Sequence, residues 1–548
     1  TGTIAKAALT QKIRSGLTME DALETVWASD KYALPVQLAT IALSEASGIS
    51  RLVHVFQHDA LALHTGKLID FRHPDTGEMI RKPLPLFRTI VANLPFVQFE
   101  DVRIANPDVY AINRRLRREV GMELPRRADL YAYLPFYLWD LLAPDGRLGV
   151  IMSNSWLGTE WGEVFRKILT HYYHIESVTV SQNGRWFANA DVVTTLVVLV
   201  KRPTPGVPAA SEQTTFVYLK DRIDRADEET ISELAARAIV GSPSPAIAIR
   251  TRTREEIENL ERFGLPWCAL FADLSWFARV STLLAPVRDF FHISRGTRRG
   301  WDRLFYPPKD AGIEPHFLKP VLKSPRSIRG LIAAPDAQAF CCSLSVEELK
   351  RRGAFGALEW IRRFETATNT TGEPLPQVLQ LPGRYWYEMD TSTLADLVML
   401  INYDQRLFVA KLVERSFVNQ RLTAFVAKAG VDVDLCHALL NSLLGLFYIE
   451  ALGFGRGLAA LDLNATKIRT NMWMLDPRRL TQEAASSIKR AFAPLVERPV
   501  GNLEDELQSE DRRRFDETVL AAYGLADLLE PIRASLLELY RIRRAARM

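Results

Sequence analysis

Three short apolar runs near the start of the chain each lead to a polar side chain, and this repeat restricts the possible folds more than any other feature. The polar residues are Asp30, Asp59 and Asn93, which are about 30 residues apart, and a helical stretch at residues 34–46 separates the first two. Strands and helices that alternate at this spacing form βαβ units with parallel strands. We therefore predict an α/β domain whose three polar side chains lie at the carboxyl edge of a sheet, where such folds bind ligands.

The third apolar run is followed directly by Asn93-Leu94-Pro95-Phe96. A side-chain amide, a main-chain carbonyl and an aromatic face are the groups that can hold a planar base with an exocyclic amine. An ordinary strand-to-loop turn is the alternative, because Asn and Pro are common turn residues. The neighbouring motifs favour the binding interpretation.

The first residues and the two acids suggest a nucleotide site. Thr1-Gly2-Thr3 opens an alanine-rich helix, and small residues at such a position let main-chain N–H groups approach a ligand. Asp30 is placed to accept hydrogen bonds from ribose hydroxyls, and Asp59 from an adenine amine. The alternatives are a simple helix start for the first motif, and a helix N-cap or a loop carboxylate for each acid.

Length and composition indicate a multidomain protein without a membrane span. The 548 residues are enough for two to four domains, and the net charge of +4 means that a nucleic-acid partner must be met by local basic patches. No apolar run reaches the roughly 18 residues of a membrane span. The chain begins with Thr1, and we expect a piece of a longer protein. The cysteines lack metal-site spacing, so we expect no metal and reduced thiols in the cytoplasm; they are Cys268, Cys341, Cys342 and Cys436.

Taken together, these motifs resemble those of N6-adenine DNA methyltransferases. Residues 144–149 read Pro-Asp-Gly-Arg-Leu-Gly and lead to Ser-Asn-Ser-Trp-Leu at residues 153–157, while residues 97–100 read Val-Gln-Phe-Glu. Within that group, the chain is similar to the methylase part of large restriction-modification and phage-defence enzymes. The resemblance implies a Rossmann-like class I methyltransferase sheet, S-adenosylmethionine as cofactor and double-stranded DNA as partner.

The resemblance also assigns roles to individual residues. Asn93 and Phe96, with Leu94 and Pro95 between them, match the catalytic motif that holds a flipped adenine. For the cofactor, Asp30 matches the acid that binds the ribose, Asp59 with the following Ala60 matches the adenine site, and the first loop is represented by Thr1, Gly2 and Thr3.

The chain departs from the family pattern at two places. Leu94 stands where the family has proline, so we expect a softer loop and lower turnover. The front of the glycine-rich first loop is absent, so we expect weak cofactor binding or none. An upstream segment or a partner chain can carry the missing loop, or a nuclease.

The rear half has the composition of a DNA-reading region. The resemblance implies a methyltransferase domain at residues 1–205, truncated at its N-terminus, and a bridging segment at 206–264. An α+β target-recognition domain follows at 265–478, and a helical C-terminal segment at 479–548. Basic side chains bind phosphates and aromatic rings stack on bases. The candidate DNA contacts are Arg295, Thr297, Arg298, Arg299, Trp301, Lys323 and Arg326. A solvated basic face is the alternative.

Three functions follow from these predictions. The first is a site-specific DNA adenine-N6 methyltransferase of a bacterial restriction or anti-phage system. The second is a DNA-binding scaffold subunit of a defence complex with an impaired catalytic centre. The third is a methyltransferase that acts on cytosine N4, on RNA or on a protein glutamine.

Overall fold

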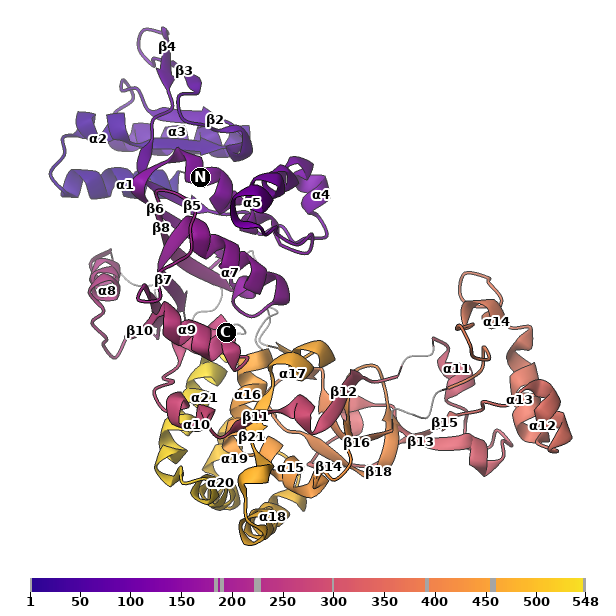
Figure 1. Cartoon of the computed structure of the whole chain (residues 1–548). Coiled ribbons are helices and arrows are strands. Elements are labelled where there is room, and N and C mark those ends of the chain that lie inside the picture. The colour runs from indigo at the N-terminus through magenta and orange to yellow at the C-terminus, as the bar shows by residue number, and fades with distance from the viewer. Residues whose placement is uncertain are drawn as a thin grey trace. The chain divides into compact units, whose positions relative to one another are not determined.

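The protein is described by a computed structural model that covers residues 2–181, 186–187, 192–220, 228–297, 300–389, 394–453 and 460–545. The chain divides into two compact units, and each is described by itself (Figure 1). The N-terminal unit comprises Thr1–Glu258 and Ala545–Met548, and the C-terminal unit comprises Asn259–Arg544.

The main sheet of the N-terminal unit has six strands in the order β10-β9-β7-β8-β6-β5. β5 runs parallel to β6, while β8 is antiparallel to both β6 and β7. The helix α7 packs against this sheet (Figure 1). The strands are β5 (Phe87–Asn93), β6 (Leu142–Ser153), β7 (Tyr173–Ser181), β8 (Thr194–Lys201), β9 (Gln213–Leu219) and β10 (Ile247–Thr253). The helices of this part are α4 (Val102–Ala105), α5 (Ile112–Val120), α6 (Leu134–Leu138), α7 (Glu160–Tyr172), α8 (Glu228–Val240) and α9 (Arg254–Arg262).

A smaller parallel sheet carries the first two predicted strands. β1 pairs with β2, and a small apolar core that includes Leu9, Leu23 and Leu43 joins these strands to the first three helices. The elements are α1 (Thr3–Arg14), α2 (Met19–Thr25), β1 (Trp27–Asp30), α3 (Ala33–Ser47) and β2 (His54–Gln57), followed by a hairpin of β3 (Leu68–Arg72) and β4 (Met79–Pro83). The predicted α/β character is confirmed. The segment at 206–264, which we expected to be a bridge, contributes β9 and β10 to the main sheet.

The two sheets of the N-terminal unit are neighbours, with an open edge on each. Trp27, the first residue of β1, has its ring 6.4 Å from that of Phe87, the first residue of β5. Beyond the other ends of the strands, the Asn106 side-chain amide donates to the Asp59 carboxylate at 3.3 Å. β1 and β5 therefore run in the same direction. Among the residues that the structure describes, β1 pairs only with β2, and β5 only with β6.

The C-terminal unit contains a seven-stranded sheet. Its order is β12-β19-β16-β18-β13-β15, and β14 pairs with β18. The strands of this sheet are β12 (Phe291–Arg295), β13 (Leu318–Leu322), β14 (Ile332–Ala333), β15 (Ala337–Phe340), β16 (Ala395–Leu400), β18 (Ala410–Val418) and β19 (Leu422–Ala427). Two small pairs are β11 (Leu284–Pro286) with β21 (Trp473–Leu475) and β17 (Asn402–Tyr403) with β20 (Leu461–Asp462).

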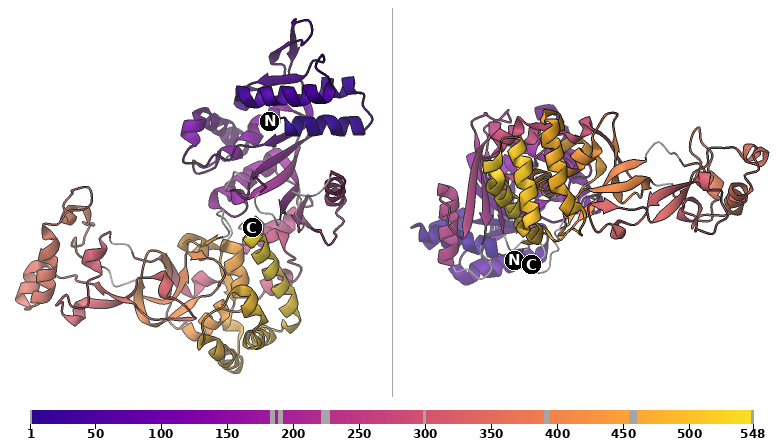
Figure 2. Two further views of the ribbon diagram at one scale, coloured as in Figure 1. Left: turned by 180° about the vertical axis from the view of Figure 1, so that it is seen from behind. Right: turned by 90° about the horizontal axis from the view of Figure 1, so that it is seen from below.

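Helices pack beside one another at the end of the C-terminal unit, coloured orange to yellow in Figures 1 and 2. The buried ion pair of Arg543 with Glu450 joins two of these helices, and a second buried pair, Arg512 with Asp516, lies within one of them. These helices are α15 (Val433–Leu440), α16 (Leu443–Gly453), α17 (Ala465–Asn471), α18 (Gln482–Val496), α19 (Leu503–Gln508), α20 (Glu510–Ala522) and α21 (Leu529–Arg544). The short helix α10 (Phe277–Ser281) comes earlier in the chain. In the described ranges no single helix is long and apolar enough to cross a membrane, although the bent pair α15 and α16 passes that test by length and composition.

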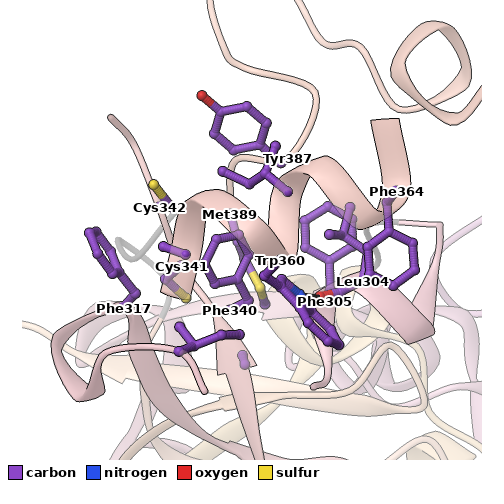
Figure 3. Packing of buried hydrophobic residues seen from close by; sticks show 14 of the residues in the cluster. Leu304, Phe305, Phe317, Phe340, Cys341, Cys342, Trp360, Phe364, Tyr387 and Met389 are labelled. Carbon is purple, nitrogen blue, oxygen red and sulfur yellow. Dashed lines mark hydrogen bonds between the residues drawn. The ribbon is translucent and has the colours of Figure 1, made fainter. Parts of the chain in front are cut away.

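A second apolar core lies in the C-terminal unit and is built mostly by residues that come between β12 and β16 in the sequence. Side chains from β13, β15 and four helices form it, and Figure 3 shows how Trp360, Phe305 and Phe340 pack together. The vicinal cysteines Cys341 and Cys342 are buried here as free thiols, as expected. The helices are α11 (Asp302–Phe305), α12 (Val346–Arg351), α13 (Phe355–Glu365) and α14 (Leu375–Val378).

Candidate active site at the edge of the main sheet

The sequence Asn93-Leu94-Pro95-Phe96, called the tetrad loop below, leaves the sheet at the end of β5. Within the described part of the chain, the Asn93 side chain is exposed and has no hydrogen-bond partner. The half-buried ring of Phe96 lies 5.8 Å from the ring of Phe187, at an angle of 52°. An amide and an aromatic ring are therefore available at the carboxyl end of a strand that runs parallel to its neighbour.

Leu94 fixes the main chain of this loop. Its N–H donates to the Ile151 carbonyl at 3.0 Å, which continues the pairing between β5 and β6 by one residue. Its side chain is only 4% exposed. A proline at this position would lack the N–H that makes this bond.

A polar network that the sequence analysis missed supports the residues after the tetrad loop. The carboxylate of Asp129 accepts hydrogen bonds from the Phe99 N–H at 3.2 Å and from the Ser155 hydroxyl at 3.1 Å. The hydroxyl of Tyr131 lies 2.8 Å from that of Ser155 and donates to it, since the Ser155 proton is directed to Asp129. Burial raises the pKa of Tyr131 well above its ordinary value, so this phenol stays a donor.

Asp129 is itself partly withdrawn from water. Burial raises its pKa above the ordinary value, and the opposing hydrogen bonds from Ser155 and Phe99 do not cancel that effect. The next residue, Leu130, donates its N–H to the Val97 carbonyl at 3.0 Å. An aspartate directly before an apolar run is a helix-start signal that could have drawn attention to this position.

Asp30 ends β1, as predicted. One carboxylate oxygen accepts the Tyr32 N–H at 2.9 Å, and its main-chain carbonyl accepts the His58 N–H at 2.9 Å. The second of these bonds joins the ends of β1 and β2. The second carboxylate oxygen of Asp30 has no partner among the described residues and can accept a hydroxyl.

Asp59 caps a short 3-10 helix that begins at Ala60. One oxygen accepts the Leu61 N–H at 3.0 Å, and the other lies 3.1 Å from the Lys31 ammonium and accepts the Asn106 amide. Burial alone would raise the pKa of Asp59, but the Leu61 hydrogen bond and the Lys31 charge outweigh it, so the pKa is lower than usual. The carboxylate is thus a structural N-cap that also faces the residues beyond β5.

The first loop is described only from Gly2 onward, so Thr1 lies outside the described residues. Gly2 has a φ of 80° and precedes α1, which begins at Thr3. A Cβ atom on Gly2 would lie 2.7 Å from the Ala39 Cα atom of α3. The close approach of α1 to α3 therefore requires a glycine here, whatever ligand binds nearby.

Two of the predicted DNA contacts of the C-terminal unit, Arg295 and Thr297, lie at the turn between β18 and β19. Exposed Arg295 donates from Nε to the Gln420 carbonyl at 2.7 Å, and the Thr297 N–H donates to the Val418 carbonyl at 2.8 Å. Gly296 permits this approach, because a Cβ atom there would lie 2.5 Å from the Val418 oxygen. Two further members of the predicted set lie outside the described residues, Arg298 and Arg299.

The remaining members have different surroundings. The Lys323 ammonium lies 4.9 Å from the centre of the Tyr306 ring and 3.8 Å from the Asp302 carboxylate. Arg326 is exposed, and in the described ranges its side chain has no partner. Trp301 packs against the second core of the unit, which gives its ring a structural role.

The fold of the chain is similar to that of a solved restriction-modification enzyme. Over 95% of its residues it is similar to the type IIL restriction-modification enzyme MmeI, solved in complex with DNA, with a TM-score of 0.50 and 12% identity. The type IIG restriction endonuclease BpuSI matches over 93% of this chain and 60% of its own, with a TM-score of 0.39 and 14% identity.

In sequence, 132 residues are 29% identical to the type II methyltransferase M.XhoI of Xanthomonas vasicola. This match covers 24% of the chain and 22% of that methyltransferase, and the chain spans 66% of the length of MmeI. No protein family description matches the chain.

Proposed function

We propose that the chain is the methylating and DNA-reading part of a site-specific DNA adenine-N6 methyltransferase in a bacterial restriction-modification or anti-phage defence system. The tetrad loop carries the proposal, because it presents a free amide and an aromatic ring at the carboxyl edge of an α/β sheet. The fold shared with MmeI and the local similarity to a type II methyltransferase support it. Adenine is preferred to cytosine because the tetrad resembles the adenine-specific motif.

The residues of the tetrad loop can prepare an adenine for methylation. The N6 amine is conjugated with its ring, so its lone pair is a poor nucleophile. The Asn93 side-chain oxygen and the Leu94 carbonyl can accept its two hydrogens and favour a pyramidal nitrogen, while Phe96 stacks on the base after it leaves the duplex. Alignment and electrostatics then provide most of the rate gain, and no strong general base is needed.

S-adenosylmethionine would supply the methyl group when bound. The donor set fits this cofactor in part: Asp30 retains a free oxygen for ribose hydroxyls, and the carboxylate of Asp59 has lone pairs beyond those that its present bonds use. Ala60, Gly2 and Thr3 are the further residues that we place around the cofactor.

The rest of the first cofactor loop can come from a strand between the two sheets. β1 and β5 run in the same direction and each has an unpaired edge, so each edge offers main-chain groups to a further parallel strand. We propose that an additional segment or a partner chain supplies this strand and the loop. The same additional segment or partner chain can also carry a nuclease.

Transfer of a tritiated methyl group to unmethylated double-stranded DNA tests the proposal. We expect incorporation with the full chain once the missing loop is provided, and Asn93→Ala should lower incorporation at least 100-fold while DNA binding is retained. Incorporation into RNA or a protein glutamine but not into DNA would refute the assignment of the substrate. Nucleoside analysis of the product would separate adenine N6 from cytosine N4.

A DNA-binding scaffold with an impaired catalytic centre is the second candidate, favoured by Leu94 at a position where the resembled family has proline. Calorimetric titration with S-adenosylmethionine distinguishes the two, because a scaffold needs no micromolar cofactor binding. In a complete enzyme, Leu94→Pro tests whether loop rigidity limits single-turnover methylation. An unchanged rate would show that the leucine is no impairment.

A further inference from the structure

A tight turn with two adjacent arginines lies beside the tetrad loop. The Ala128 N–H donates to the Pro125 carbonyl at 2.9 Å, and this bond closes the turn around Arg126 and Arg127. Both arginines are exposed, and within the described ranges neither guanidinium has a hydrogen bond, an ion pair or a ring contact. Two unneutralised positive charges are therefore held next to each other on a fixed main chain.

The turn is fastened to the tetrad loop on its C-terminal side. The Asp129 carboxylate accepts the Phe99 N–H, and the Leu130 N–H donates to the Val97 carbonyl. Val97 directly follows Phe96 in the chain. The two hydrogen bonds thus connect the turn that carries Arg126 and Arg127 to the residues directly after Phe96, whose ring we expect to stack on the base.

The other side of the turn is held equally firmly. The Asn113 side chain exchanges two hydrogen bonds of 3.0 Å with the main chain of Leu124. The Tyr133 hydroxyl donates to the Pro125 carbonyl at 3.0 Å. Because the main chain is fixed on both sides, the two arginines can bind a ligand with little loss of backbone entropy.

Two other arginines of the same connection are neutralised by neighbouring carboxylates. Arg117 pairs with Glu123, and Arg118 pairs with Glu119 at 3.0 Å. These side chains are as exposed as those on the turn, with 66% and 74% of their surface accessible. Arg103 and Arg114 of this connection are also exposed, with no side-chain partner among the described residues, so what sets the turn apart is that its two unpaired guanidiniums are adjacent.

We infer that Arg126 and Arg127 bind the backbone phosphates that flank the base held at the tetrad loop in duplex DNA. This inference rests on the proposed function. A base that leaves the stack rotates about its own backbone, so the adjacent phosphates must be held in place. Arginine suits this task because its planar guanidinium binds two phosphate oxygens at once.

The salt dependence of DNA binding tests the inference. The full chain is titrated with a labelled unmethylated duplex at 50 to 200 mM salt, alongside Arg126→Gln/Arg127→Gln. Each lost phosphate contact should reduce the slope of log affinity against log salt by about 0.9, so we expect a reduction of about 1.8. The ratio of parent affinity to variant affinity should then be about tenfold smaller at 200 mM salt than at 50 mM salt.

Arg117→Gln/Arg118→Gln is the matched control, since it removes the same net charge from ion-paired positions. It should leave the slope nearly unchanged, and the thermal melting of both variants should match that of the parent. Equal slopes for the turn variant and the parent would overturn the inference and leave the proposed function intact. Failure of the parent chain to bind duplex DNA would overturn both.

Discussion

Asp129 links the residues after the tetrad loop to the end of β6, and its removal should loosen the loop. Asp129→Ala deletes the acceptor of the Phe99 N–H, at 3.2 Å, and of the Ser155 hydroxyl, at 3.1 Å. Hydrogen bonds to charged groups contribute about 1.5 to 3 kcal/mol each. Phe99 is 37% exposed, so water can replace part of its bond, and we take the lower end of that range for its amide.

A loss of about 1.5 kcal/mol corresponds to roughly tenfold more frequent opening of the Phe99 hydrogen bond. Amide hydrogen exchange, followed by mass spectrometry on the peptide that contains Phe99, measures this opening directly. We expect about tenfold faster exchange in Asp129→Ala and a smaller increase in Asp129→Asn, because the amide oxygen can still accept the Phe99 N–H. Neither measurement depends on methylation activity.

Asp108→Ala is the control, since this exposed carboxylate lies in the same connection and its side chain has no partner among the described residues. Unchanged exchange at Phe99 in Asp129→Ala would refute the anchoring role. The pH dependence gives a second test. The pKa of Asp129 is raised by burial in the folded state, so its contribution to the free energy of unfolding should decline as the pH rises above 3.8, and the difference between the parent and Asp129→Asn should change with pH accordingly.

Three further predictions concern stability. Burial lowers the pKa of His437 from 6.5 to about 4, so the His437 contribution to the free energy of unfolding should fall by up to about 3 kcal/mol as the pH drops between these values. In urea titrations, His437→Gln should flatten this pH dependence. Gly2→Ala should cost about 1 to 3 kcal/mol in thermal melts, and more than Gly16→Ala, which has a similar positive φ but open space around it. Arg543→Met should cost about 3 to 5 kcal/mol, and adding Glu450→Met should recover most of the loss, since the pair is buried.

Three strands of the N-terminal unit were predictable because each follows from a short apolar run, whereas the hairpin of β3 and β4, which is rich in charged residues, was not predicted. The helix expected at residues 34–46 is α3, Ala33–Ser47, and the strands expected before Asp30 and Asn93 are β1 and β5. The pairing of β9 and β10 with the main sheet was not predictable, since hydrophobic pattern sets which face of a strand is buried but not which strand lies beside it.

Individual side chains were harder to predict than elements. Trp301 stands among arginines in the sequence, which suits a base-stacking residue, but its ring packs against an apolar core whose helices extend in sequence to α14, which begins at Leu375. The sequence around Asp129 signals only a helix start, and its contacts with Phe99 and Ser155 arise only when the chain folds. Contacts between segments distant in sequence decide both cases, and local composition does not encode them.

Leu94 shows how the same departure from a family pattern can be interpreted in two ways. A proline restricts the loop through its fixed φ, so its absence predicts a softer loop. The leucine restricts the loop by other means, since its N–H bonds to Ile151 and its side chain is buried. Both residues leave the carbonyl at position 94, which is the acceptor that the proposed chemistry requires. The loss of φ restriction alone therefore does not favour the scaffold over the enzyme, and titration with S-adenosylmethionine is the measurement that separates the two.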